Sequence, residues 1–543
     1  MKTSIQIILF LFCILHYGIS FGQTVKKNEL EKADSIINRY SQAKAPGMAV
    51  GMVKDGKVIY RKMYGLANLE DQIPVKDSTA FDIASISKQF TAFVILLAEK
   101  EGRLSLNDDI RNYLPELKHL PYKITIRQLA NHTHGLPDFT SIKKLQGFGN
   151  EFRVTNAEAV KTVLAIKSIN FPPGQQYWYN NTGFMLLAEI LHRIYKKDFN
   201  DILKEYIFNP LQMNHTNAIG DPEKIIPNKA DSYQESNGTF SKYPLGQMEN
   251  GSSNMFTTLN DLCKWAINFQ KPIVGSREIY NQMQQNTLLT TGEKIEYGLG
   301  LQTGKYKGLD IVFHGGGTAG YRAYILHIPS IVLAGNGGTF DGLLIAYRLV
   351  DLFLGKYEIL PSPPQKITYT SAELKNFEGT YEINPGNYLV IRSDGKNLYQ
   401  EGDKTPFTIL GDNKFGISTI PTASVTFHPG LVKFSVGDFI FTSKKVTLAP
   451  VKEDKIDLNQ FTGYYKNEEF NTIYQLLIEN NQLIARHAIN RDVRLYPLSP
   501  ENLYSLKSFF GRLDFKYDKK NKVTGFMLAG ANMSNIEFKK LNN

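Results

Sequence analysis

Hydrophobic positions along residues 24–360 alternate between a helical and an extended rhythm. Apolar residues between Ser87 and Glu101 recur three and four positions apart, which predicts a helix that faces the core. Met48–Val53 and Val58–Tyr60 are apolar runs on either side of the polar turn Lys54–Lys57, a pattern typical of a β-hairpin. Three more strands are expected, at 297–303, 310–314 and 321–329. With strands at both ends and helices between them, this region is predicted to form one α+β domain whose ends meet in a sheet.

The pattern changes at Pro361-Ser362-Pro363-Pro364, which predicts a stiff linker over 361–368. Beyond it the helical spacing largely disappears, and short alternating strands are separated by turns. Two features of this part are repeated further along the chain: Phe377–Tyr381 at Phe461–Tyr465, and the strand pair 389–391 and 397–399 at 476–478 and 482–484. The sequence therefore predicts an all-β C-terminal region. Two small antiparallel barrels, over 369–450 and 455–543, are preferred to two halves of one larger barrel.

The first 22 residues have the layout of a secretory signal: Lys2, an apolar run through Ile7–Phe12, and small residues around Gly18 and Gly22. The run is shorter than the ~20 residues of a comfortable membrane span. The sequence therefore predicts a signal peptide over 1–22 that is cleaved near Gly22–Gln23, with an uncleaved anchor as the alternative. We expect an exported bacterial protein, periplasmic or secreted, without stable membrane insertion.

The composition of the chain excludes several classes of protein and several kinds of site. The 543 residues are 42% hydrophobic and 21% charged, which is ordinary for globular domains and excludes disordered and fibrous classes. The formal net charge of +10 is spread over both regions, so no nucleic-acid groove is expected. Cys13 lies in the predicted leader, which leaves Cys263 as the single thiol of the mature chain. An internal disulfide is therefore not expected.

A serine and a lysine three positions apart on a helix share one face, so the amine can take the hydroxyl proton and create a nucleophile. The chain contains four such pairs: Ser41/Lys44, Ser85/Lys88, Ser141/Lys144 and Ser393/Lys396. Only Ser85 stands where a strand-like segment, Phe81–Ile83, meets the start of an apolar helix. Unpaired N–H groups at a helix start favour an oxyanion. From this pair alone, a helix cap with a solvated lysine is an equally good interpretation.

Two further segments favour a catalytic site. Tyr179 and Asn181 lie two positions apart in a loop before an apolar helix at 184–194, so both can point into one cleft. A tyrosine near a lysine can be held partly as phenolate and act as a base, and an asparagine amide can hold a substrate carbonyl. His314-Gly315-Gly316-Gly317 ends a strand, where glycines let a substrate backbone lie along the strand edge and add an oxyanion donor. An aromatic loop on the core and a plain glycine turn are the alternatives.

These motifs carry a resemblance. Ser85-Ile86-Ser87-Lys88, Tyr179-Asn180-Asn181 and His314-Gly315-Gly316 follow the order and spacing of the three motifs of serine β-lactamases and penicillin-binding proteins. The surrounding sequence resembles the branch of class C β-lactamases and D-alanyl-D-alanine carboxypeptidases, at Pro46–Val50, Phe81–Phe90, Glu101–Leu106, His132–Leu136, Pro172–Gly174 and Gly315–Gly320. The likeness covers nearly all of 30–355. It implies a β-lactamase-like serine hydrolase domain over 23–360, an antiparallel sheet flanked by helices, followed by barrels that resemble lipocalin-like repeats.

The resemblance also implies residue roles. Ser85 would be acylated, Lys88 and Tyr179 would share proton transfer, and Asn181 would hold the substrate amide. The backbone N–H groups of Ser85 and Gly317 would form the oxyanion hole. No metal or cofactor is implied.

The third motif departs from the Lys-Thr-Gly of β-lactamases. His314 stands in the place of the lysine and, with Gly316, would contact the substrate. Without the lysine charge and the threonine hydroxyl, recognition of a substrate carboxylate is weaker, so weak or no β-lactam hydrolysis is expected. His-Gly-Gly followed by barrels resembles the D-aminopeptidases of this branch, in which the barrels shape the mouth of the active site.

The expected function is therefore an exported serine hydrolase that forms an acyl-enzyme on an amide or ester. The preferred substrates are peptides that contain D-amino acids, peptidoglycan fragments among them. A carboxylesterase of the same fold is one alternative, and a non-catalytic penicillin-binding sensor or scaffold is another. A metal hydrolase built on His132, His134 and Asp138 is a further alternative, although the sequence has no HExxH motif and no second histidine cluster.

Overall fold

The computed structural model describes most of the chain, namely residues 27–41, 43–149, 151–236, 238–327, 330–338, 341–353, 368–401, 405–417, 423–436, 439–446 and 456–541. The predicted leader 1–22 and the prolines at 361–364 lie outside these residues. Within the described ranges, none of the helices combines the length and apolar character that a membrane crossing requires.

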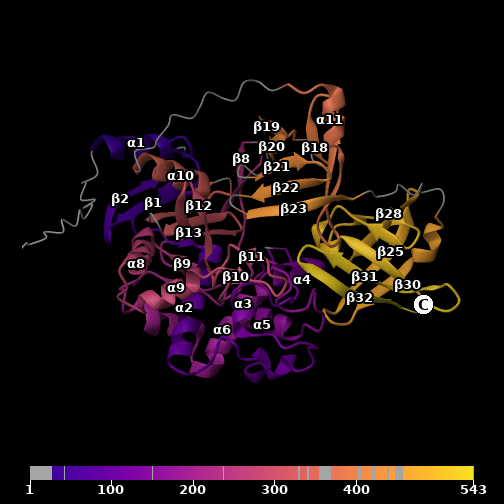
Figure 1. The fold of residues 1–543 in the computed structure, drawn as a ribbon, viewed down its shortest axis with the longest axis horizontal. Helices are drawn as coiled ribbons and strands as arrows, with labels where there is room; N and C mark the ends of the chain where they lie inside the picture. The colour runs from indigo at the N-terminus through magenta and orange to yellow at the C-terminus, as the bar shows by residue number, and fades with distance from the viewer. Residues whose placement is uncertain are drawn as a thin grey trace, which may run out of the picture.

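A six-stranded antiparallel sheet forms the centre of the first domain (Figure 1). Its strands, in spatial order, are β12 (Gln302–Tyr306), β13 (Leu309–Thr318), β14 (Tyr321–His327), β15 (Ser330–Gly335), β1 (Met48–Lys54) and β2 (Lys57–Tyr64). Strand β1 pairs with β15, with Met48 opposite Gly335. The two ends of the domain therefore meet in one sheet, as the sequence predicts, and the predicted hairpin at 48–60 is confirmed. The strand expected at 297–303 begins later, at Gln302.

Helices cover both faces of this sheet. Alternate residues of β1 explain why: Met48, Val50 and Met52 face a core shared with α1 and α10, whereas Ala49 and Val53 face the larger core on the other side. Helix α8 packs so closely on that second face that a side chain at Gly51 would meet the Cys263 sulfur at 2.7 Å. The helices are α1 (Lys27–Ile37), α2 (Ser87–Lys100), α3 (Ile126–Ala130), α4 (Phe139–Leu145), α5 (Asn156–Leu164), α6 (Thr182–Tyr195), α7 (Phe199–Leu203), α8 (Leu259–Gln270), α9 (Arg277–Gln284), α10 (Gly342–Phe353) and, beyond this domain, α11 (Ser371–Phe377).

Short strands complete the first domain around the large helical core. They form one three-stranded sheet and three two-stranded pairs. Their bounds are β5 (Phe81–Asp82), β9 (Met255–Thr257) and β6 (Asn217–Ala218) for the sheet, and β3 (Leu66–Asn68) with β4 (Ile73–Pro74), β7 (Tyr233–Ser236) with β8 (Thr239–Lys242), and β10 (Thr287–Leu288) with β11 (Lys294–Ile295) for the pairs.

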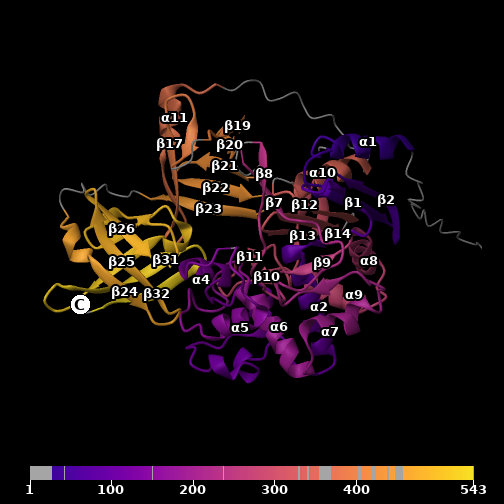
Figure 2. The ribbon, with the colours of Figure 1, turned by 180° about the vertical axis from the view of Figure 1, so that it is seen from behind.

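The C-terminal region is all-β, as expected, and consists of a half-barrel and a nearly closed barrel (Figures 1 and 2). The half-barrel contains β16 (Gly379–Asn384), β17 (Asn387–Ser393), β18 (Leu398–Gln400), β19 (Thr408–Gly411), β20 (Lys414–Gly416), β21 (Ala423–His428), β22 (Leu431–Val436) and β23 (Phe439–Val446). The second barrel contains β24 (Gly463–Asn467), β25 (Thr472–Glu479), β26 (Gln482–His487), β27 (Val493–Arg494), β28 (Tyr496–Ser499), β29 (Asn502–Tyr504), β30 (Arg512–Tyr517), β31 (Val523–Gly530) and β32 (Met533–Lys540).

The repeat in the sequence corresponds to a repeat in structure. The two sheets have equivalent strand orders, and the Tyr381 hydroxyl donates to the Phe377 carbonyl (3.2 Å) just as the Tyr465 hydroxyl donates to the Phe461 carbonyl (2.7 Å). The register of the next strand shifts by two residues from the expected repeat, because Gly379 pairs with Ile391 whereas Gly463 pairs with Leu476. Strand pairing therefore aligns Ile391, and not Leu389, with Leu476.

The two C-terminal sheets differ in how they join the first domain. Buried side chains of the second barrel, among them Tyr474 and Phe510, belong to one continuous apolar core with the first domain, whereas the half-barrel has a core of its own. The Tyr474 hydroxyl donates to the Leu145 carbonyl at the end of α4 (2.9 Å). The second barrel is thus packed directly against the helices that surround the predicted site.

Candidate active site

Ser85 lies in a tight turn between strand β5 and helix α2. The turn is a single 3-10 segment, Ala84–Ile86, and Ala84 has φ +47°, a left-handed conformation that is costly for a residue with a Cβ. Two hydrogen bonds maintain it: the Ala84 N–H donates to Asp82 Oδ1 (2.7 Å), and the Ile83 N–H donates to the Met255 carbonyl (2.9 Å). The turn therefore presents Ser85 ahead of the helix, in a backbone conformation that the neighbouring strand holds in place.

Lys88 follows one turn later and is fully buried. Its Nζ lies 3.1 Å from Ser85 Oγ, 2.8 Å from Asn181 Oδ1 and 3.0 Å from the Ser252 carbonyl oxygen. Burial lowers the pKa of Lys88, and the charges of Glu249 and Asp138 oppose this effect only in part. The amine is therefore neutral far more readily than an exposed lysine.

A neutral amine has two hydrogens and one lone pair. The Asn181 and Ser252 oxygens can only accept hydrogen bonds, so they take the two hydrogens of Lys88. The lone pair then points at the third partner, the Ser85 hydroxyl, which becomes the donor. This arrangement allows the Ser85 proton to move to Lys88 as the serine oxygen attacks.

Tyr179 lies above the same amine, with Lys88 Nζ 4.9 Å from the centre of its ring. Burial raises the pKa of the Tyr179 hydroxyl above its ordinary value, and the charges of Asp138 and Glu249 raise it further, although a hydrogen bond with Ser85 opposes the rise. Tyr179 is thus a neutral phenol. The partial phenolate expected from the sequence is not formed, because the hydroxyl is shielded from water beside carboxylates.

Asn181 immediately precedes helix α6 and forms hydrogen bonds with residues of several other elements. Besides accepting from Lys88, its Nδ2 donates to Thr140 Oγ1 (3.3 Å), and its backbone N–H donates to Asp138 Oδ1 (2.8 Å). The structure thus brings together four of the predicted residues, Ser85, Lys88, Tyr179 and Asn181, although they lie in segments nearly a hundred positions apart.

His314 lies behind this group and is almost completely buried, with 1% of its surface exposed. Both ring nitrogens of His314 take part in a series of hydrogen bonds in which each group donates to the next. The Asn180 N–H donates to His132 Nδ1 (3.3 Å), which leaves His132 Nε2–H to donate to the Tyr297 hydroxyl (3.1 Å). Tyr297 then donates to His314 Nε2 (3.2 Å), and His314 Nδ1–H donates to the Gly315 carbonyl (2.6 Å).

Both histidines in this series of hydrogen bonds, His132 and His314, are neutral. Burial and the nearby Lys88 lower the pKa of His314 to about 3, and they lower the pKa of His132 well below its ordinary value. The third motif therefore carries no positive charge at this position. The ring of His314 instead orients the glycine backbone that follows it.

Position 316 requires a glycine because two segments of backbone lie very close together there. Strand β13 passes so near the Ser85 turn that a Cβ at Gly316 would lie 2.2 Å from the Ile83 carbonyl oxygen. Gly315 and Gly317 face the other side of the strand, where a Cβ would lie 3.7 Å from Tyr324 and 3.6 Å from Arg322. The residues after Phe313 extend beyond the pairing with β12, so this stretch of strand borders the site.

The metal-site alternative loses its geometric basis. His134 Nε2 donates to Asn180 Oδ1 (3.1 Å), and its Nδ1 accepts from the Leu136 N–H (2.9 Å), so both of its nitrogens, like those of His132, are engaged within the protein. Asp138 caps helix α4 by accepting from the Ser141 N–H (3.1 Å). Across the residues that the structure describes, no three His, Cys, Asp or Glu side chains are grouped so as to hold a metal ion.

Three contributors to the site were not found from the sequence: Glu249, the Ser252 carbonyl and Tyr297. Glu249 is buried near Lys88, and burial together with Asp138 raises the pKa of its carboxyl. Only the tertiary structure brings these residues to the site, because each lies more than 150 positions from Ser85 and belongs to no recognised motif. The segment that contains Glu249 and Ser252 is a polar loop sequence before β9, so it offered no local signal.

The other Ser-x-x-Lys pairs differ in their contacts. Ser141 lies on helix α4, and its hydroxyl is 3.4 Å from Asp138 Oδ2. Ser393 Oγ accepts from the Gly395 N–H (2.9 Å) in a turn between strands. Ser41 follows helix α1 in a loop.

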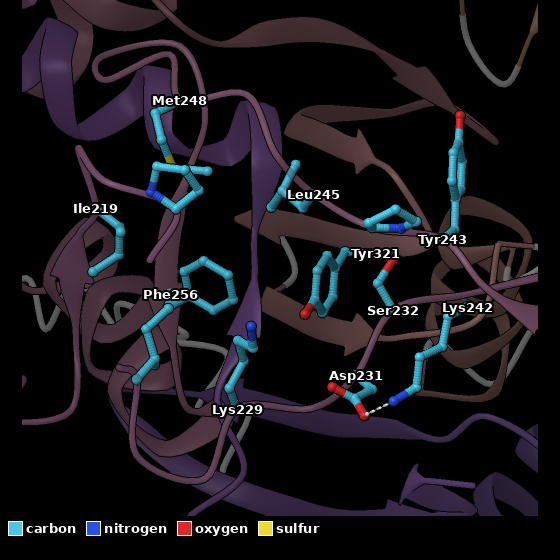
Figure 3. Close-up of a pocket in the computed structure, with 13 residues that line it drawn as sticks. Ile219, Lys229, Asp231, Ser232, Lys242, Tyr243, Leu245, Met248, Phe256 and Tyr321 are labelled. Carbon is cyan, nitrogen blue, oxygen red and sulfur yellow. Dashed lines mark ion pairs between the residues drawn. The ribbon is translucent and has the colours of Figure 1, made fainter. Parts of the chain in front are cut away.

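A cavity of about 250 Å³ lies beside the site elements, between the β7–β8 hairpin and Tyr321 (Figure 3). Tyr321 pairs with Thr318 at the end of the third motif, and Phe256 pairs with Asp82 before the Ser85 turn. An ion pair between Lys242 and Asp231 (3.2 Å) closes one side of it. None of the predicted catalytic residues lines this cavity. We therefore place the candidate chemistry at Ser85 and not in the cavity.

Residues 33–347 match the family model described as Beta-lactamase. A D-aminopeptidase of Gluconobacter oxydans (strain 621H) is 29% identical over 287 residues, which cover 52% of this chain and 54% of that protein. Penicillin-binding protein 4* of Bacillus subtilis (strain 168) is 26% identical over 412 residues, which cover 69% of this chain and 88% of that protein. The match thus spans about half the length of the D-aminopeptidase.

Among solved structures, the octameric penicillin-binding protein homologue from Pyrococcus abyssi is similar with a TM-score of 0.56 and 24% identity. The match covers 76% of this chain and 99% of that one. At this identity the likeness concerns the fold.

Proposed function

This chain belongs to the Beta-lactamase family, and from this premise we propose that it is a serine hydrolase that forms an acyl-enzyme at Ser85. The observation that carries the proposal is the environment of Lys88. Its amine is fully buried, is in contact with the Ser85 hydroxyl, and has acceptors for both hydrogens of its neutral form. A lysine in this state is a base whose lone pair already faces the nucleophile.

In the first step, Ser85 Oγ forms a bond to the substrate carbonyl carbon while its proton passes to Lys88. The tetrahedral intermediate then expels an amine or alcohol, which receives a proton from Lys88 through the neutral Tyr179 hydroxyl. Water next attacks the ester carbon and gives up a proton to the same groups, the bond to Ser85 Oγ breaks, and the product is a carboxylic acid. The proton that Lys88 takes from Ser85 leaves with the amine or alcohol during acylation, and the proton taken from water returns to Ser85 Oγ as the ester bond breaks during deacylation.

Substrate and intermediate would be held by groups around the nucleophile. We assign the oxyanion hole to the backbone N–H groups of Ser85 and Gly317, a type of donor whose loss typically costs about 10²–10³ in rate. The Asn181 side chain would bind the substrate amide. Gly316 would border the substrate along β13, and His314 would support that strand edge from behind.

For the substrate class, we propose peptides that contain D-amino acids, including fragments of peptidoglycan. Relatives named D-aminopeptidase and penicillin-binding protein support this choice. The absence of a cation at His314 supports weak or no hydrolysis of β-lactams, because their carboxylate would find no charged partner there. The predicted leader supports export to the periplasm or the medium.

The test is covalent labelling followed by a substrate panel on the full-length mature chain. A fluorophosphonate probe and mass spectrometry report whether Ser85 is acylated, with Ser85→Ala and Ser141→Ala compared in parallel. Turnover of a D-amino-acid amide or peptide supports the proposal. Turnover of a nitrophenyl ester alone would favour the carboxylesterase alternative, and lasting fluorescent penicillin label without turnover would favour a sensor. The absence of any adduct at Ser85 would overturn the acyl-enzyme mechanism.

A further inference from the structure

Asn532 of the second C-terminal barrel contacts the active-site loop. It lies in the tight turn between β31 and β32, where Gly530 pairs with Met533 and Asn532 has φ +52°. Its Nδ2 donates to the Tyr179 carbonyl (3.0 Å), and its own carbonyl accepts from the Asp138 N–H (3.1 Å). The β31–β32 hairpin lies against helix α4 in both views of the molecule (Figures 1 and 2).

The loop from Trp178 to Asn181 is held mainly by the first domain. The Trp178 N–H donates to the His132 carbonyl (3.0 Å), the Asn180 N–H to His132 Nδ1 (3.3 Å) and the Asn181 N–H to Asp138 Oδ1 (2.8 Å). The Tyr179 carbonyl is bound from the other domain, by Asn532. The same residue fixes the backbone of Asp138, which in turn holds Asn181.

A second asparagine strengthens this contact. Asn170 Nδ2 also donates to the Asn532 carbonyl (3.1 Å), and Asn170 Oδ1 accepts from the Ser534 N–H (2.8 Å). The turn is thus fixed to the first domain on both sides.

We propose that Asn532 is a positioning residue for acylation: the C-terminal barrel uses its side-chain amide to hold Tyr179, and its carbonyl to hold Asp138, in the arrangement that proton transfer requires. This inference rests on the proposed serine hydrolase function. It assigns to the second barrel a part in the chemistry of the first domain, in addition to its packing.

The structure offers a matched control. Asn535 lies three residues further, also has a positive φ (+60°), and donates from Nδ2 to the Ile169 carbonyl (2.8 Å) across the same interface, away from Tyr179. Glycine adopts a positive φ without strain, so Asn532→Gly and Asn535→Gly each remove the interdomain hydrogen bonds of one asparagine side chain without distorting the turn. Asn532→Asp removes the donor with almost no change in size.

We expect Asn532→Gly and Asn532→Asp to lower the rate of Ser85 acylation about 10- to 100-fold, with KM little changed, because a small displacement of a proton-transfer group has effects of this size. Asn535→Gly should keep the wild-type rate while its melting temperature falls as far as that of Asn532→Gly. Equal acylation rates for Asn532→Gly and Asn535→Gly would overturn the inference and leave the proposed function intact. A wild-type chain without any label at Ser85 would instead overturn the proposed function.

A crystal structure of Asn532→Gly provides a readout that does not depend on activity. Displacement of Tyr179 from its position over Lys88 is the expected result. An unchanged Tyr179 in that crystal would show that the amide does not position it.

Discussion

Lys88 places its amine 3.1 Å from the Ser85 hydroxyl oxygen, while two acceptor-only oxygens take the hydrogens of its neutral form. Because burial lowers the pKa of Lys88 below its ordinary value of 10.5, the free base exists at lower pH than for an exposed lysine. The reactive form is deprotonated, so the acylation rate should rise with pH through this lowered pKa.

Replacing Ser85 with alanine should abolish acylation. Removal of a serine nucleophile lowers the turnover rate by about 10⁶-fold, because no other group can form the covalent bond. Labelling with a fluorophosphonate probe measures this loss. Ser141→Ala, the other helical serine of a Ser-x-x-Lys pair, should keep its label, and similar losses in both variants would mean that the wrong serine has been chosen.

Replacing Glu249 with glutamine should move the pH profile of acylation. The Glu249 carboxylate raises the pKa of Lys88, an effect that Asp138 shares, whereas the neutral histidines His132 and His314 carry no charge toward the amine. Removing the charge of Glu249 therefore lowers the pKa of Lys88 further. The rising limb of kcat/KM against pH should shift to lower pH, so the rate on the acidic side increases.

The control for this shift is Glu205→Gln, which removes an exposed carboxylate paired with Lys197. Its pH profile should coincide with that of the wild type. A shift of the Glu249→Gln profile to higher pH, or no shift at all, would contradict the assignment of Lys88 as the base.

Replacing Tyr297 with phenylalanine should destabilise the fold. The change removes one hydroxyl and leaves buried nitrogens of both His132 and His314 without their partner. An unsatisfied buried polar group costs about 1–3 kcal/mol, so the free energy of unfolding should fall by at least that amount. Urea unfolding measures this free energy. Tyr40→Phe, at an exposed tyrosine, is the control. Equal stability of the two variants would contradict the series of hydrogen bonds through Tyr297.

Replacing Gly316 with alanine should separate strand β13 from the Ser85 turn. The new Cβ would lie 2.2 Å from the Ile83 carbonyl oxygen, so the backbone must move, at a cost of about 1–3 kcal/mol or more. Both the melting temperature and the acylation rate should fall. Gly315→Ala meets only Tyr324, at 3.7 Å, and should be tolerated; equal behaviour of the two variants would count against the close approach.

The local features of the chain could be predicted because they depend on neighbours in sequence. Helical spacing predicts a helix from Ser87 to Glu101, where α2 spans Ser87–Lys100, and alternation with a polar turn predicts the first hairpin. The motif residues Ser85, Lys88, Tyr179 and Asn181 were likewise recognisable by type and spacing, and the structure brings them together.

The protonation states were not predictable. From its place near a lysine, Tyr179 was expected to be held partly as phenolate, but its hydroxyl is buried beside Asp138 and Glu249, which keeps it neutral. A pKa depends on the summed field and burial from every surrounding segment. No local pattern contains that sum.

The amino-acid sequence indicates which residue types are available for catalysis, where several of the helices and strands lie, and that the C-terminal region repeats. The folded chain is needed to show that Ser252 and Glu249 lie around Lys88, that the second barrel shares a core with the first domain, and that Asn532 contacts Tyr179. These two kinds of feature depend on interactions over different distances along the chain. Secondary structure follows from periodicity over a few residues, whereas burial and hydrogen bonding join groups that lie hundreds of positions apart and meet only once the chain has folded.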